Sequence, residues 1–168
     1  MADLNHMREE DVRALTVINI AFGLIRDGEV VWDAKDARDG MVSIRKSNPE
    51  LKIVLSVGGW GADGFSQAAR TKEGRERFAA SALAIVKEYG LDGIDIDWEF
   101  PGMTFSSNAY DELVDVENFT LLMKDLRAEL GQSTLLTYAG YCMDKRPQGE
   151  GYKYIDVKAV DPYVDFVK

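Results

Sequence analysis

Four carboxylates lie close together near the middle of the chain. They are Asp92, Asp95, Asp97 and Glu99. The last three alternate with the apolar residues Ile94, Ile96 and Trp98. Successive side chains of a strand point to opposite faces. The alternation predicts a buried strand over residues 92–98, with Asp95, Asp97 and Glu99 directed to one side and the apolar residues to the other.

These three carboxylates are close enough to change one another's protonation. Side chains two residues apart on a strand lie about 7 Å from each other. Three anions at that spacing repel, so at neutral pH at least one is expected to keep a proton and become a usable general acid. A solvated strand face is disfavoured by the apolar residues around it. A hard-cation site built from Asp95, Asp97 and Glu99 stays open as an alternative.

Two motifs resemble those of one known family. The acidic segment resembles the DxxDxDxE signature of the glycoside hydrolase family 18 chitinases, matched at Asp92, Asp95, Asp97 and Glu99. The upstream segment 52–60 resembles that family's SxGG motif, matched at Ser56, Gly58 and Gly59. The two motifs stand in the right order and about 35 residues apart, as one strand–helix–strand unit requires.

The resemblance implies an α/β fold, a parallel (β/α) barrel of the TIM type. The chain has 168 residues, whereas a complete barrel takes about 250. Residues 1–10 show no strand pattern, and the segment that follows 164–167 in the family lies beyond the last residue. We therefore expect an incomplete barrel, about strands two to six of eight, that forms a single partial catalytic domain over residues 1–168.

Alternating patterns along the chain agree with this fold class. The expected strands are 15–22, 52–57, 92–98, 135–139 and 164–167. The expected helices are 36–47, 71–89 and 115–130, and glycines at positions 90 and 131 end the last two. Strands separated by helices of this length pair in parallel. Catalytic groups then belong at the carboxyl ends of the strands.

The resemblance also implies a mechanism, substrate-assisted retaining hydrolysis of β-1,4-linked N-acetylglucosamine polymers such as chitin, without a cofactor or metal. Glu99 would protonate the glycosidic oxygen and then act as a base on water. Asp97 would hold the acetamido N–H, so that the substrate's own carbonyl oxygen attacks the anomeric carbon. Asp95 would tune Asp97 by sharing a proton or a hydrogen bond. The alternative is a carbohydrate-binding fragment of such a barrel without effective turnover.

Aromatic rings and a glycine loop supply the candidates for substrate binding, because rings stack on the apolar faces of sugars. The candidates are Trp60, Gly59, Tyr138, Tyr141 and Trp98. Trp98 alternates away from the acids, which favours core packing over binding. Trp60 follows two glycines and suits either role, and Gly59 lets the backbone approach a ligand or a strand closely.

Bulk properties narrow the partners. The net charge of -9 and the lack of a basic cluster argue against nucleic acid, and no apolar run is long enough to predict a membrane span. The single cysteine excludes an intramolecular disulfide. The resemblance implies secretion, although the first six residues lack the basic start and apolar centre of a signal peptide. A barrel with strands missing has open sheet edges, which predicts self-association.

Overall fold

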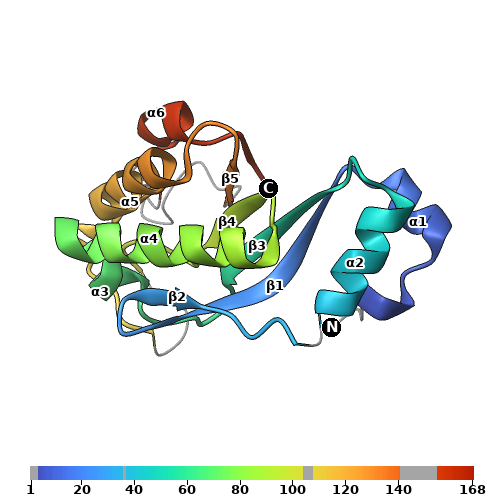
Figure 1. Ribbon diagram of the computed structural model, residues 1–168. Helices are drawn as coiled ribbons and strands as arrows, with labels where there is room; N and C mark the ends of the chain where they lie inside the picture. The colour runs from blue at the N-terminus through green and yellow to red at the C-terminus, as the bar shows by residue number, and fades with distance from the viewer. Residues whose placement is uncertain (1–3, 36, 104–107, 141–154) are drawn as a thin grey trace.

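The computed structural model describes residues 4–35, 37–103, 108–140 and 155–168. Six strands form one sheet in the order β2-β1-β3-β4-β5-β6 (Figure 1). They are β1 (Val17–Arg26), β2 (Glu29–Val31), β3 (Lys52–Gly58), β4 (Gly93–Asp97), β5 (Leu135–Tyr138) and β6 (Phe166–Val167). Every neighbouring pair from β1 through β6 is parallel, whereas β2 runs antiparallel to the end of β1. The parallel strands confirm the predicted partial barrel.

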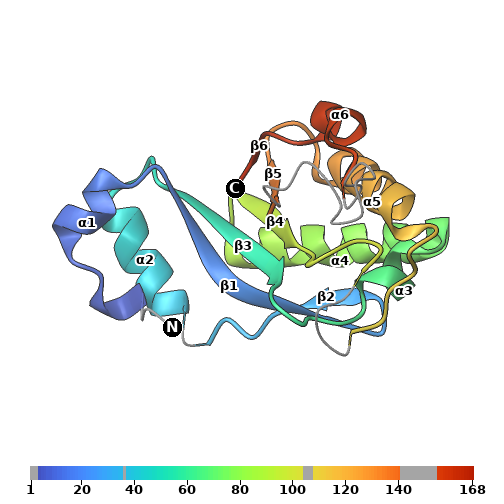
Figure 2. The same ribbon diagram turned by 180° about the vertical axis from the view of Figure 1, so that it is seen from behind.

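Helices lie over one face of this sheet and beyond the starts of its first parallel strands (Figures 1 and 2). They are α1 (Glu9–Ala14), α2 (Arg38–Ser47), α3 (Phe65–Ala69), α4 (Lys72–Tyr89), α5 (Asp115–Leu130) and α6 (Val157–Val160), with short 3₁₀ turns η1 (Leu4–His6) and η2 (Asp161–Tyr163). In both views α4 and α5 lie side by side over the sheet, and α1 and α2 lie together beyond the starts of β1 and β3 (Figures 1 and 2). Among the described residues, no helix crosses the face of β3 and β4 that Figure 2 turns toward the viewer.

Aromatic packing fills the layer between the sheet and the helices. The Phe65 and Trp98 rings stack with centroids 5.1 Å apart and an interplanar angle of 7°. Phe119 on α5 meets Trp98 edge-on at 6.1 Å and Tyr138 edge-on at 5.5 Å. Because offset and edge-on rings pack favourably, these aromatics form a continuous part of the core.

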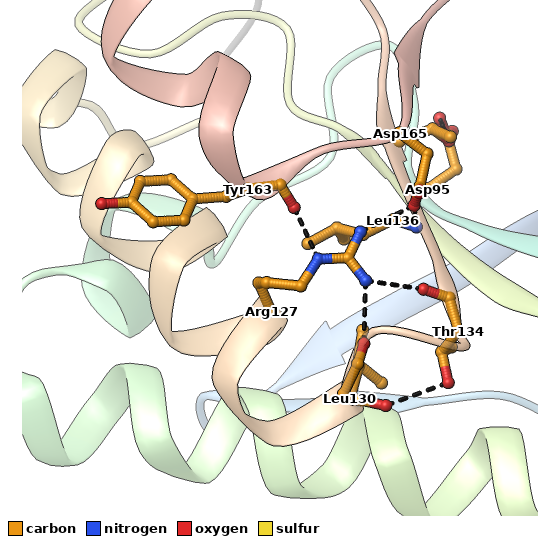
Figure 3. A network of polar contacts seen from close by, with 9 residues as sticks. Asp95, Arg127, Leu130, Thr134, Leu136, Tyr163 and Asp165 are labelled. Atoms are coloured by element: carbon orange, nitrogen blue, oxygen red, sulfur yellow. Dashed lines mark hydrogen bonds and ion pairs between the residues drawn. The ribbon is translucent and has the colours of Figure 1, made fainter.

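Arg127 near the end of α5 fastens β5 to β6 at their amino ends (Figure 3). Its guanidinium donates to Asp165 Oδ2 at 2.6 Å and to the carbonyl oxygens of Tyr163 and Thr134, each at 2.8 Å. Asp165 in turn accepts the backbone N–H of Leu136 at 2.8 Å. One buried cation thus satisfies carbonyls that no strand partner reaches, and it sets where β6 begins.

Arg45 on α2 repeats this arrangement between β3 and β4. It donates to Asp92 Oδ2 at 2.6 Å and to the carbonyl oxygens of Leu51 and Gly90 at 3.1 and 2.9 Å. Asp92 accepts the backbone N–H of Ile53 at 2.8 Å. Asp92 therefore fixes the start of the acidic strand through its contacts with α2 and β3.

Some local structure differs from the sequence expectation. The first strand continues past position 22 to Arg26, and after the Asp27–Gly28 turn β2 returns beside it, in a segment where no strand was expected. A strand of three residues is too short for period-two alternation to reveal. The helix expected over 36–47 is described from Arg38 onward, and the glycine stops at 90 and 131 are confirmed.

Candidate active site

The acidic residues of β4 lie in a row that runs from the core toward the surface. Asp95 is fully buried and Asp97 is 9% exposed. Glu99 follows the strand and is partly exposed. The strand alternation that points Ile94 and Ile96 into the helix layer directs Asp95 and Asp97 to the opposite face. The row therefore ends with its most accessible carboxyl at the carboxyl end of the strand, where barrel chemistry takes place.

Asp95 is held by side chains from the two neighbouring strands and from the residue after β6. Ser56 Oγ donates to its Oδ2 at 2.6 Å, and Thr137 Oγ1 donates to its Oδ1 at 2.7 Å. Both hydroxyls stand directly opposite Asp95 in the parallel register. The ammonium of Lys168, just after β6, lies 2.9 Å from Oδ2. Asp95 is thus a fully partnered acceptor inside the sheet.

The two outer carboxyls hold their protons more strongly than usual. Burial is the largest cause that raises the pKa of Asp97, and Asp95 raises it further while Lys168 opposes the increase. Burial likewise leads in raising the pKa of Glu99, followed by the negative charge of Asp97, again with Lys168 opposing. A proton on either carboxyl therefore persists to a higher pH than on an ordinary carboxyl, which suits a general acid.

A glycine loop lies against the end of this strand. Gly58 and Gly59 have φ values of 114° and 95°, in the left-handed region that favours glycine. A Cβ on Gly58 would lie 2.2 Å from the carbonyl oxygen of Asp97. The Gly59 N–H donates to that same oxygen at 2.9 Å, and a Cβ on Gly59 would meet the Phe22 ring at 2.8 Å. The two glycines thus let β3 and β4 end in close contact.

The aromatic candidates separate into different environments. Trp60, directly after the glycines, is 66% exposed. Trp98 is 2% exposed and Tyr138 is equally buried, both within the aromatic layer under α5, so neither ring presents a face to solvent in the described structure. Core packing, the favoured interpretation of Trp98, agrees with this placement. Tyr141 lies outside the described residues.

Several site residues escaped the sequence reasoning. Thr137 and Lys168 reach Asp95 from β5 and from the end of β6, and no local pattern marks Lys168. Strand parity supplies a signal for Thr137, since it alternates with the apolar Leu136 and Tyr138. Phe22 lies over Gly59 with its ring partly exposed. Its position at the expected end of the first strand was the available signal.

Other features of the described structure lie away from this site. A cavity of about 420 Å³ between α2 and α4 is lined by residues such as Met41, Arg45 and Tyr89. It lies at the amino ends of the strands, opposite the acid row, where barrels gain stability rather than catalysis. Within the described ranges, no three Asp, Glu, His or Cys side chains are arranged to hold a metal ion, so the hard-cation alternative has no ligand set there. No helix in those ranges is long and apolar enough to cross a membrane.

Fold and site together define a segment of a parallel (β/α) barrel with an acid row at the carboxyl end of one strand. The family model described as glycosyl hydrolases family 18 matches residues 3–168, and the chain belongs to that family.

Relatives of known structure extend this comparison. The chain is 36% identical to a glycoside hydrolase family 18 N-acetylglucosaminidase from Paenibacillus barengoltzii, with a TM-score of 0.87 over 98% of this chain and 49% of that one. A Group IV chitinase from Ostrinia furnacalis, solved in complex with allosamidin, has a TM-score of 0.80 at 30% identity, over 99% and 44% of the two chains. The probable chitinase 2 of Drosophila melanogaster is 32% identical over 135 residues, 79% of this chain and 26% of that protein. The chain thus spans about half the length of the solved structures and about a quarter of this curated relative.

Proposed function

We propose that this chain carries the acid-bearing part of a chitinase-type glycoside hydrolase that acts on β-1,4-linked N-acetylglucosamine polymers. The observation that carries the proposal is the graded row of Asp95, Asp97 and Glu99, in which the outermost carboxyl is accessible and has a raised pKa. Family membership supports the reaction class, and the names of the relatives, a chitinase and an N-acetylglucosaminidase, support the sugar.

The proposed mechanism assigns one task to each carboxyl. Asp97 accepts a hydrogen bond from the substrate's acetamido N–H, which turns the acetamido oxygen toward the anomeric carbon. As that oxygen forms its bond, the glycosidic C–O bond breaks, and the leaving oxygen takes the electron pair and the proton of Glu99. Glu99, now ionised, removes a proton from the water that opens the cyclic intermediate, so the product retains its configuration and Glu99 regains its proton.

A second candidate is sugar binding without turnover. The chain spans less than half of each of the two solved relatives named above, and a site that lacks part of its barrel can hold a sugar without orienting it for reaction. A fluorogenic chitobioside and chitotrioside, assayed beside calorimetric binding of the plain oligosaccharides to the 168-residue protein, separate the two. Release of the fluorophore supports hydrolysis, and binding without release supports the second candidate.

Asp97→Asn tests the substrate-assisted step. Asparagine keeps the size of the side chain, but its neutral amide orients the acetamido N–H poorly, and misplacement of a reacting group costs about 100-fold in rate. We expect a loss of turnover of that order, and we expect a thiazoline analogue of the cyclised sugar to inhibit the parent protein. Trapping of a sugar on a protein carboxylate, or product with inverted configuration, would contradict the mechanism.

We also propose that the 168-residue protein self-associates through its open sheet edges. Among the described strands, β2 pairs only with the last residues of β1, and β6 pairs only with β5. Exposed apolar side chains lie on β6, namely Phe166 and Val167, and on the second half of β1, namely Phe22 and Leu24. Unpaired strand edges recruit partner strands, and a lysine placed on an edge opposes this.

Light scattering at micromolar concentration tests this association. We expect the parent protein to form dimers or larger species and Val167→Lys to reduce them. Because Val167 is 47% exposed, the substitution leaves the core intact. A strictly monomeric parent that unfolds in one cooperative transition would show that the partial barrel closes its own edges.

A further inference from the structure

The buried carboxylate Asp95 has a cation beside it that the proposed mechanism does not use. The Lys168 Nζ lies 2.9 Å from Asp95 Oδ2, where it joins the Ser56 and Thr137 hydroxyls. The Lys168 backbone is fixed on both sides, because its N–H donates to the Tyr138 carbonyl at 3.1 Å and its carbonyl accepts from the Gly140 N–H at 2.8 Å. The strand register therefore holds the ammonium at the inner end of the acid row.

Hydrogen-bond polarity indicates which state of Asp95 this environment accepts. An ammonium is a donor without acceptor capacity. The Ser56 and Thr137 hydroxyls can accept as well as donate, so the ammonium is the partner that requires an acceptor on Asp95, and the ionised carboxylate can receive all three groups at once. A buried carboxylate is costly unless it is paired and hydrogen-bonded, and here it is both.

The charge balance of the whole row depends on the same lysine. In the part of the chain that the structure describes, the charges that act on Asp97 are those of Asp95 and Lys168, and those that act on Glu99 are Asp97 and Lys168. Lys168 opposes the increase in pKa at both carboxyls. Three carboxyls thus face one ammonium, and the carboxyl that pairs with it has least need of a proton.

We propose that Lys168 is a positioning residue that holds Asp95 as a fixed anion, so that the mobile proton of the acid row is confined to Asp97 and Glu99. This deepens the proposed function and rests on it for its catalytic meaning. It also replaces the expectation that Asp95 shares a proton with Asp97, because the fixed anion tunes Asp97 by charge alone. The negative charge on Asp95 is a property of the protein without substrate, so it can be tested apart from hydrolysis.

Carboxyl-carbon NMR titration of the free 168-residue protein tests this without any turnover. Removal of the ammonium in Lys168→Met is expected to raise the titration midpoints of Asp97 and Glu99 by about 1 pH unit, because the charge of Lys168 lowers the pKa of both carboxyls and a nearby opposite charge shifts a carboxyl by roughly that amount. Lys168→Arg keeps the charge and is expected to keep the midpoints. Lys52→Met is the matched control, because the Lys52 Nζ lies 3.6 Å from Asp92 Oδ1, at the amino end of β4 and away from the acid row.

Asp95→Asn provides an independent test in the opposite direction. If Asp95 is a fixed anion, its replacement removes a negative charge and lowers the Asp97 midpoint. If Asp95 instead carries the shared proton, the same replacement leaves that midpoint in place. An unchanged Asp97 midpoint in this variant, or Lys168→Met indistinguishable from Lys52→Met, overturns the assignment, whereas an inactive chain with the expected shifts overturns only the proposed hydrolysis.

Discussion

Replacement of Glu99 by glutamine is expected to lower turnover of a fluorogenic chitobioside by about 100- to 10,000-fold, the usual contribution of a general acid. Glutamine preserves the size and hydrogen-bonding capacity of the side chain but has no proton to give to the leaving oxygen. Because Glu99 lies after β4 and is partly exposed, the fold and the binding of chitooligosaccharides are expected to change little.

The pH profile of turnover by the parent protein supplies a second test of Glu99 as the general acid. Burial raises the pKa of Glu99. The acid form therefore survives to a higher pH than in an ordinary glutamic acid, and the rate falls as the pH rises through that raised pKa. Glu50→Gln, at an exposed turn before β3, is the matched control for the substitution itself. If Glu99→Gln turns over as fast as that control, Glu99 is not the acid.

The sequence was sufficient to predict the acid strand because both of its signals are local. Period-two alternation separates Asp95 and Asp97 from Ile94 and Ile96 whatever the rest of the chain does. The glycine helix stops are local as well, since Gly90 adopts a left-handed φ of 63° that few other residues accept. Elements that rest on such local rules agree with the structure.

The partners of Asp95 could not be predicted in the same way. Ser56 lies on β3, Thr137 on β5 and Lys168 just after β6, and the contacts depend on the register that brings Ser56 and Thr137 opposite Asp95. The register between parallel strands depends on how the connecting helices return the chain to the sheet. A short stretch of sequence does not reveal it. Tyr138 shows the converse, since an aromatic residue at the carboxyl end of a strand suggested sugar binding, whereas its parity directs the ring into the core.

The two arginines that join neighbouring strands, Arg127 and Arg45, are a further long-range feature. We expect a large loss of stability when the more buried of them, Arg127, is replaced. Arg127 has a side chain 8% exposed and donates to three carbonyl oxygens as well as to Asp165. Arg127→Met keeps much of the apolar stem but leaves those carbonyls and the carboxylate without a cation. Removal of one partner from a buried ion pair costs about 3 to 5 kcal/mol. We expect a loss near the lower figure, because Asp165 is partly exposed.

The equivalent arginine on α2 allows the expected losses in free energy of unfolding to be ranked. Arg45 makes the same kinds of contacts, but its side chain is 33% exposed, so water replaces part of what Arg45→Met removes, and a loss of about 1 to 2 kcal/mol is expected. Arg13, which pairs with Glu9 on the surface of α1, is the matched control at about 0.5 kcal/mol or less.

Urea unfolding followed by circular dichroism gives the three free energies of unfolding. A loss in Arg127→Met no greater than in Arg13→Met would show that β5 and β6 stay joined without the cation. In that case the placement of Lys168 beside Asp95 would depend on the strand hydrogen bonds alone, since Arg127 lies at the other end of the same two strands.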